Sequence, residues 1–198
     1  MKEHNLRYLQ SELGKLDPWL LDSNLYEQQR YEIMLNLIVT GSPYPCGMEI
    51  GCAAGSFTYQ LASICERLSV VDVMPLALER CKNRLHNFSN VQYINADISK
   101  HNEPSQSFDL IVIAEVLYFL EYLDAIESIK KIMDWVKVGG TVIFCSVIDN
   151  VVDSWGVTSG AESCMKEWDK KLIEVERINC IGQLPDEKSL IVKYVRKN

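Results

Sequence analysis

The amino-acid sequence predicts an α/β fold in which a mostly parallel β-sheet is covered by helices on both faces. Short apolar runs alternate at least four times with stretches in which apolar residues recur at helical spacing. The apolar runs are hydrophobic at nearly every position, which is typical of strands that are buried on both faces. Because parallel strands need crossover connections, which are usually helices, this alternation indicates a parallel sheet.

The expected elements are separated by turn residues. Apolar residues at Ile33, Leu37 and Ile38 indicate one helix, which the segment GSPYPCG ends. Pro75 suits the first turn of a later helix. The expected helices are 26–39, 56–68, 75–87 and 122–137, and the expected strands are 48–52, 68–73, 91–97, 108–115 and 139–148. The stretches 174–182 and 189–198 are expected to form a closing hairpin.

Composition excludes several classes of protein. The chain of 198 residues is long enough for one domain with a sizeable core. Its net charge of −7 and the lack of a basic run make it a poor candidate for binding nucleic acid. The longest apolar run is too short to span a bilayer, and the charged N-terminus does not resemble a secretory signal.

The seven cysteines are odd in number and scattered, and no CxxC pair occurs among them. This pattern argues against a disulfide framework or a zinc site, so no metal is expected. It is typical of thiols buried in a protein of the reducing cytoplasm, which is the expected location.

The turn in MEIGCAAGSF (48–57) follows the first expected strand and precedes a helix. Gly51 and Gly55 can adopt backbone angles that are closed to other residues and let a ligand approach the main chain. The helix that follows offers free N–H groups. A dinucleotide fingerprint would need glycine at the positions of Ala53 and Ser56, so the match to it is poor. The alternative is a tight turn that binds no ligand.

A carboxylate ends the second expected strand. Asp72 lies 21 residues after Gly51, and an acid at this place can accept hydrogen bonds from both hydroxyls of a ribose. Val73 and Met74 follow it and could pack against an adenine ring. Because dinucleotide-binding folds share this arrangement, Asp72 indicates a ribose without identifying the cofactor. The alternative is that Asp72 caps the helix that begins at Pro75.

The pattern E-x-G-x-x-x-G from Glu49 to Gly55 resembles the first motif of the class I S-adenosylmethionine-dependent methyltransferases. This resemblance implies a Rossmann-like fold and a role for Glu49 in ordering the amino-acid end of the ligand, often through water. The turn residues expected at the cofactor are Gly51, Cys52, Ala53 and Gly55.

The same resemblance assigns roles to the ends of the third and fourth strands. Asp97 and Ile98 would meet the amine and the ring of the adenine, although Asp97 could be an ordinary turn residue. The backbone of Ala114 and the carboxylate of Glu115 would lie beside the sulfonium. An acid at the end of an apolar strand is costly to bury without a partner, so Glu115 is expected to be exposed in the cleft or paired with a cation.

Several longer stretches resemble one family, the nodulation N-methyltransferases (nodulation protein S). They are DPWLLDSNLYEQQR, MEIGCAAGSFTYQLA, RLSVVDVMPLAL, FDLIVIAEVLYFLE, SWGVTSGAES and ERINCIGQLPDEKSL. The resemblance implies a seven-stranded sheet whose last strand is antiparallel. It also implies methyl transfer from S-adenosyl-L-methionine, with S-adenosyl-L-homocysteine as product, to the free amine of a deacetylated glucosamine at the non-reducing end of a chitooligosaccharide.

Two alternatives remain open. The acceptor could be another small-molecule amine or hydroxyl, or the chain could be a non-catalytic module that binds S-adenosylmethionine. The expected partner is a small-molecule or oligosaccharide acceptor, with no nucleic acid or membrane, and the chain is expected to be a monomer or weak dimer.

One domain of three segments is expected over 1–198. Residues 1–40 would form a helical cap over the cofactor cleft, 46–148 the cofactor-binding core, and 149–198 the acceptor side with the closing hairpin. His4 falls in a terminus expected to be mobile, and no histidine is assigned a role.

Four more residues complete the predicted site. Arg30 would bind the carboxylate of the cofactor, since planar bidentate recognition favours arginine, unless it is a solvated charge on a helix face. Trp19 is assigned to the cofactor, and Tyr118 and Trp155 to the acceptor, because aromatic faces stack on sugars. A core role is open for each of the three. Glu115 is the candidate to hold the acceptor amine and relay its proton, or it only orders the cofactor.

Overall fold

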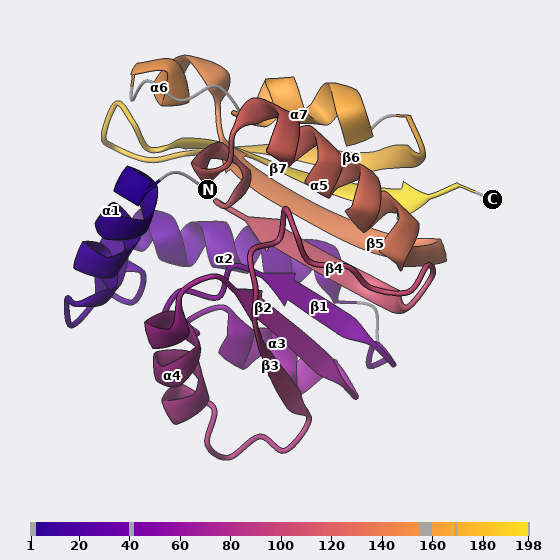
Figure 1. The fold of residues 1–198 in the computed structure, drawn as a ribbon. Helices are drawn as coiled ribbons and strands as arrows, with labels where there is room; N and C mark the ends of the chain where they lie inside the picture. The colour runs from indigo at the N-terminus through magenta and orange to yellow at the C-terminus, as the bar shows by residue number, and fades with distance from the viewer. Residues whose placement is uncertain (1–2, 40–41, 155–159, 169, 198) are drawn as a thin grey trace.

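The computed structural model describes residues 3–39, 42–154, 160–168 and 170–197 of the chain, and one sheet runs through it (Figure 1). The strands lie in the order β3-β2-β1-β4-β5-β7-β6. Their bounds are β1 Gly47–Ile50, β2 Leu68–Asp72, β3 Val91–Asn95, β4 Phe108–Ala114, β5 Val136–Val147, β6 Leu172–Ile181 and β7 Lys188–Arg196. The helices are α1 Glu3–Leu13, α2 Leu25–Ile38, α3 Thr58–Ile64, α4 Pro75–Arg84, α5 Tyr122–Trp135, α6 Asp149–Ser154 and α7 Ala161–Trp168, with short 3₁₀ turns η1 Pro18–Leu20 and η2 Leu117–Phe119.

The strand directions confirm the predicted sheet. The pairs β1–β2, β1–β4, β2–β3 and β4–β5 are parallel, whereas β7 is antiparallel to both β5 and β6. The sheet is therefore mostly parallel, has seven strands and has an antiparallel last strand. The order reverses between β1 and β4, and this is the switch point at which open α/β sheets bind ligands.

Helices cover both faces of the sheet because successive side chains of a strand point to opposite sides. In β2, Val70 packs with the buried residues of α2, α3 and α4, whereas Val71 packs with those of α5 and α7. In β4, Val112 packs on the same side as Val70, and Ile111 packs on the same side as Val71. Figure 1 shows the two helical layers on either side of the sheet.

The first predicted strand and the helix predicted over 122–137 both end earlier in the structure than expected. The first strand ends at Ile50 rather than at residue 52, because Gly51 has a φ of +81° that an extended strand does not allow. The helix predicted over 122–137 ends at Trp135, and β5 begins directly after it. Gly139, with a φ of +76°, lies within β5 in a stretch where the register with β4 shifts.

The N-terminal segment contains the helix α1, whose boundaries were not predicted. His4 lies in α1 and lines a cavity at the switch point. Leu9 and Leu13 of α1 are buried, and Asn5 donates a hydrogen bond of 2.8 Å to the carbonyl of Phe119. These contacts fix the cap over the carboxyl ends of the strands.

Two arginines of α4 hold the segment that follows α1. Arg80 donates to three backbone carbonyls within 2.6 Å, those of Leu13, Lys15 and Leu16. Arg84 forms an ion pair of 2.5 Å with Asp22. These contacts join the N-terminal cap to α4, the helix that follows Asp72.

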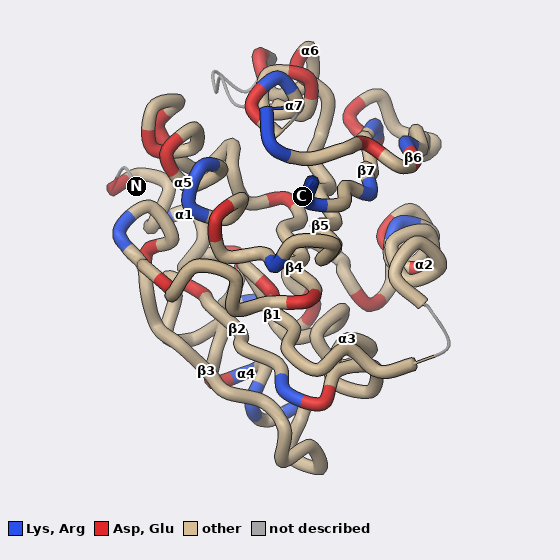
Figure 2. The backbone as a smooth tube through the Cα atoms, turned by 90° about the vertical axis from the view of Figure 1, so that its right-hand side faces the viewer, with Lys and Arg blue, Asp and Glu red and all other residues tan. Residues whose placement is uncertain are grey.

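Charged residues of both signs are interspersed along the chain in Figure 2. Within the described residues, no helix is long and apolar enough to cross a membrane. None of the seven cysteines forms a disulfide bond, and six of them are buried.

The turn after β1 depends on glycine at position 51. A Cβ atom there would lie 2.3 Å from Cγ2 of Val116, so Gly51→Ala adds a clash to the cost of the left-handed backbone. We expect the substitution to lower the free energy of unfolding by about 3 kcal/mol, measured by urea denaturation.

Gly139→Ala is the matched control, because Gly139 also has a positive φ but has open space around it. It should lower the free energy of unfolding by only about 1 kcal/mol. Equal losses in the two variants would show that the contact with Val116 is not what requires glycine at position 51.

Candidate active site

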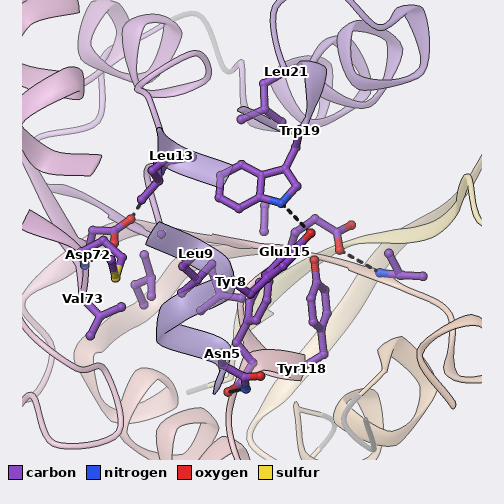
Figure 3. Close-up of a pocket in the computed structure, with 18 of the residues that line it drawn as sticks. Asn5, Tyr8, Leu9, Leu13, Trp19, Leu21, Asp72, Val73, Glu115 and Tyr118 are labelled. Atoms are coloured by element: carbon purple, nitrogen blue, oxygen red, sulfur yellow. Dashed lines mark hydrogen bonds between the residues drawn. The ribbon is translucent and has the colours of Figure 1, made fainter. Parts of the chain in front are cut away.

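A cavity of about 760 Å³ lies at the carboxyl ends of β1, β2 and β4, between these strand ends and the N-terminal cap. Figure 3 shows Asp72 and Val73 at one end and Glu115 and Tyr118 at the other, with Leu9 of α1 between them. The volume is within the range of small-molecule sites. We refer to these as the Asp72 end and the Glu115 end of the cavity.

The structure brings many of the predicted cofactor residues together at the Asp72 end. Those that line the cavity there are Gly51, Ala53, Asp72, Val73, Met74 and Ile98. They come from three different strand ends and lie together because the parallel register brings these ends to the same edge. Apolar side chains beside a carboxylate match the two halves of an adenosine.

The carboxylate of Asp72 holds the glycine turn. One oxygen accepts hydrogen bonds from the backbone N–H groups of Cys52 and Ala53, at 3.0 and 3.3 Å, and the other accepts from Met74 at 2.8 Å. Burial raises the pKa of Asp72, and these backbone donors oppose the rise. Met74, not Asp72, is the N-cap residue of α4, so the alternative of a helix cap is wrong. Sequence reasoning missed this support of the turn.

The turn itself is strained. Gly51, Ala53 and Gly55 have φ values of +81°, +47° and +82°, and alanine adopts such angles at a cost of about 1–2 kcal/mol. Gly55 does not line the cavity. A Cβ atom there would lie 3.0 Å from Cα of Cys81 in α4, so glycine at this position serves packing against α4.

Three other predicted cofactor residues also lie outside the cavity lining. Glu49 is 4% exposed on β1, and its burial raises its pKa well above the ordinary value, so the neutral form is favoured. Cys52, within the turn, is buried. Asp97 accepts hydrogen bonds from the N–H and the hydroxyl of Ser99, as a turn residue does. Contacts of these three with the cofactor stay predictions.

A lysine that the sequence analysis did not single out positions Ile98. Lys131 of α5 donates to the carbonyls of Ile98, Ser99 and His101, at 3.2, 2.8 and 2.8 Å. This fixes the loop after β3 that carries Ile98 to the cavity. No local pattern indicates the role, because the loop lies about 30 residues away in the sequence.

The Glu115 end of the cavity centres on an arginine between two carboxylates. Arg30 is 5% exposed, and its Nη1 lies 2.6 Å from Oε1 of Glu115, while its Nη2 forms an ion pair with Glu27. Burial alone would lower the pKa of Arg30, but the carboxylates of Glu115 and Glu27 raise it above its usual range. The guanidinium is therefore not a solvated helix-face charge. Whether it also binds the cofactor carboxylate stays a prediction.

Glu115 is paired with a cation, one of the two options that its place in the sequence allowed. Its Oε1 accepts from Arg30 and from the hydroxyl of Ser189, the latter at 3.0 Å. Its Oε2 accepts from the N–H of Val147 at 3.2 Å. Ala114 precedes it in the cavity lining. These contacts join Glu115 to α2, β5 and β7.

Glu27 was not among the predicted site residues. It lies in the first turn of α2 and lines the cavity. Burial raises its pKa to about 7, and the neighbouring carboxylates of Glu115 and Glu187 add to the rise, while Arg30 opposes it. The signal in the sequence was its spacing of three residues from Arg30, which places both side chains on one face of a helix.

The turn between β6 and β7 closes the Glu115 end. The carboxylate of Glu187 accepts from the side chain of Asn24 at 2.9 Å and from the N–H groups of Gln183 and Leu184 at 2.8 and 3.0 Å. Asp186 is exposed and lines the same end. Carboxylates therefore outnumber the one arginine among the residues that line this end.

Aromatic side chains connect the cap to the Glu115 end. Nε1 of Trp19 donates to the hydroxyl of Tyr8 at 3.1 Å (Figure 3). The ring of Tyr8 stacks on Phe119 with centroids 6.2 Å apart. Tyr118 lies beside Phe119, with centroids 4.6 Å apart, and lines the cavity with Trp19. Burial and the Glu115 carboxylate raise the pKa of Tyr118, so its hydroxyl stays neutral. Trp155 lies outside the described residues.

Known proteins resemble the chain over its whole length. Nodulation protein S of Sinorhizobium fredii (strain NGR234) is 40% identical over 192 residues, which cover 96% of this chain and 88% of that protein. Nodulation protein S of Bradyrhizobium diazoefficiens is 39% identical over 198 residues, which cover 98% of this chain and 93% of that protein.

A solved structure also superimposes closely. The crystal structure of N-methyltransferase NodS from Bradyrhizobium japonicum WM9, in complex with S-adenosyl-L-homocysteine, matches with a TM-score of 0.96 and 37% identity, covering 99% of this chain and 100% of that chain. The family model described as nodulation protein S (NodS) matches residues 1–198. The chain therefore belongs to the nodulation protein S family.

Proposed function

We propose that this member of the nodulation protein S family is an S-adenosylmethionine-dependent methyltransferase that acts on the free amine of a deacetylated glucosamine at the non-reducing end of a chitooligosaccharide. The observation that carries the proposal is the polarity of the cavity. One end offers apolar side chains and Asp72, and the other offers several carboxylates around Arg30.

The Asp72 end suits the adenosine of the cofactor. Val73, Met74 and Ile98 offer apolar surface for an adenine ring. The two oxygens of Asp72 accept three backbone hydrogen bonds, and a carboxylate has about four acceptor positions, so capacity remains for a ribose hydroxyl. When bound, S-adenosylmethionine supplies a methyl group on a sulfonium, to which an acceptor nitrogen adds as the carbon–sulfur bond breaks.

The Glu115 end suits an amine. Glu27, Glu115, Asp186 and Glu187 line it with one arginine, and a site with excess negative charge attracts a cationic ligand. Tyr118 and Phe119 beside them offer ring faces on which the apolar face of a sugar can stack. The protein's contribution is to align the amine with the methyl group and to exclude water.

The first prediction concerns the ribose. Asp72→Ala should weaken S-adenosylhomocysteine binding by about 3 kcal/mol, because hydrogen bonds to a charged group are lost. Calorimetric titration measures this, with Asp134→Ala as control, since Asp134 is a partly exposed carboxylate paired with Lys171 outside the cavity.

A cofactor analogue distinguishes a direct contact between Asp72 and the ribose from an indirect effect of Asp72 through its support of the glycine turn. S-Adenosylhomocysteine that lacks the 2′-hydroxyl should bind the unmodified chain more weakly than the complete compound does. The two compounds should bind Asp72→Ala equally. If the difference between them persists in the variant, Asp72 does not contact that hydroxyl.

The second prediction concerns the acceptor. With S-adenosylmethionine labelled in its methyl group, a chitooligosaccharide deacetylated at its non-reducing end should take up label, and the fully acetylated oligosaccharide should not. Transfer to the acetylated compound would indicate a hydroxyl acceptor. Cofactor binding without transfer to any amine would favour the non-catalytic module.

The remaining expectations concern the surroundings of the enzyme. A small-molecule or oligosaccharide acceptor follows from the proposal. The cytoplasmic location and the monomer or weak dimer stay predictions.

A further inference from the structure

We propose that the carboxylate of Glu27 receives the proton of the acceptor amine, and that Glu115 acts as a positioning residue that holds Arg30. This inference rests on the proposed function, because it concerns an amine that must lose a proton before its nitrogen can attack. Glu27 and Glu115 both contact Arg30 and both line the cavity, so the question is which of them has capacity left for a substrate.

The hydrogen bonds of the two carboxylates differ. Glu115 accepts on both oxygens, from Arg30 of α2, Ser189 of β7 and the backbone of Val147 in β5. Glu27 accepts only from Arg30, on Oε2, as far as the described residues show. Its Oε1 therefore remains available to a ligand, whereas Glu115 is held in place by three elements.

The charged groups that face Glu27 are one cation and two carboxylates. Arg30 on its own helix is the cation, and the carboxylates of Glu115 and Glu187 face it from β4 and from the β6–β7 turn. Tyr31, Cys145 and Cys180 also lie near enough to interact with it, and burial raises the pKa of each of them, so they remain uncharged.

Burial and these neighbouring carboxylates raise the pKa of Glu27 to about 7. A general base works best when its pKa lies near the operating pH, because it is then both ionised and able to take a proton. A carboxyl with an ordinary pKa would be a much weaker base towards an ammonium group. Glu27 therefore has the negative charge, the position in the cavity and the basicity that deprotonation of an amine substrate requires.

The ammonium group of the acceptor gives one proton to the ionised carboxylate of Glu27, which leaves a neutral amine and a neutral carboxyl. The nitrogen lone pair then forms the bond to the methyl carbon, and the sulfur keeps the electron pair of the bond that breaks. Glu27 returns its proton to solvent after the methylated ammonium product leaves. Arg30 stays paired with Glu115 throughout, and the proton transfer leaves the net charge of the site unchanged.

The test compares Glu27→Gln with the unmodified chain over a range of pH. The amide keeps the shape and an oxygen for Arg30 but cannot accept the proton. We expect kcat/KM for the deacetylated chitooligosaccharide to fall about 100-fold at pH 7. The loss should shrink to about tenfold or less at pH 9.5, because solvent then deprotonates the amine.

Two controls and a second variant accompany the measurement on Glu27→Gln. Glu32→Gln changes an exposed carboxylate on the same helix, outside the cavity, and should leave kcat/KM unchanged. Glu27→Asp retains a carboxylate and should recover part of the activity that Glu27→Gln loses. Affinity for S-adenosylhomocysteine, measured by calorimetry, should stay within threefold in Glu27→Gln.

Proton release gives a readout that does not depend on turnover. In the complex the acceptor amine and Glu27 together hold one proton, so binding must release the fraction of a proton that Glu27 carries in the free chain at pH 7. Calorimetry in two buffers of different ionisation enthalpy should detect this release when the deacetylated oligosaccharide binds to the chain loaded with S-adenosylhomocysteine. Glu27→Gln should reduce this release, and Glu32→Gln should not.

Three results would overturn the inference. One is an activity loss in Glu27→Gln that is absent or independent of pH. Another is a large loss of S-adenosylhomocysteine affinity with unchanged turnover, which would make Glu27 a cofactor ligand. If the unmodified chain methylates no deacetylated oligosaccharide, the proposed function fails first and the inference falls with it. An assay of the unmodified chain identifies this third result, because the other two results concern Glu27→Gln.

Discussion

The guanidinium of Arg30 lies buried between two carboxylates from distant parts of the chain, and the Glu115 end of the cavity depends on this arrangement. Glu27 and Arg30 belong to α2, whereas Glu115 follows β4 and is bonded in turn to β5 and β7. A buried charge without its partner is strongly destabilising, so Arg30 and Glu115 depend on each other. The N-terminal helices are therefore joined to the sheet by a charge balance as well as by apolar packing.

The two ends of the cavity are organised in different ways. At the Asp72 end, one carboxylate fixes the backbone of a strained turn and keeps acceptor capacity for a ribose. At the Glu115 end, the carboxylates are divided between one that is held by three elements and one that has an unused oxygen. A methyl donor bound across the cavity would lie with its nucleoside at the first end and its reacting group near the second. On the proposed mechanism, this division would place recognition of the cofactor and removal of a proton within one cavity.

The sequence predicted the fold and much of the Asp72 end because both depend on local pattern. Parallel strands bring their carboxyl ends to one edge, so Asp72, Ile98 and Glu115 could be placed together from their positions after strands. Contacts between distant segments could not be read in this way. The support of the Ile98 loop by Lys131 and the restraint of the cap by Arg80 both join residues that are 30 or more positions apart. Gly55 was predicted at the ligand, but the close approach there is to α4.

A crystal structure of this chain with S-adenosylhomocysteine tests the central claim most directly. The account predicts the ribose against Asp72, the adenine between Val73 and Ile98, and the sulfur turned towards Glu27. Arg30 should remain paired with Glu115. A structure with the nucleoside at the Glu115 end, or with the carboxylate of Glu27 turned out of the cavity, would contradict the account.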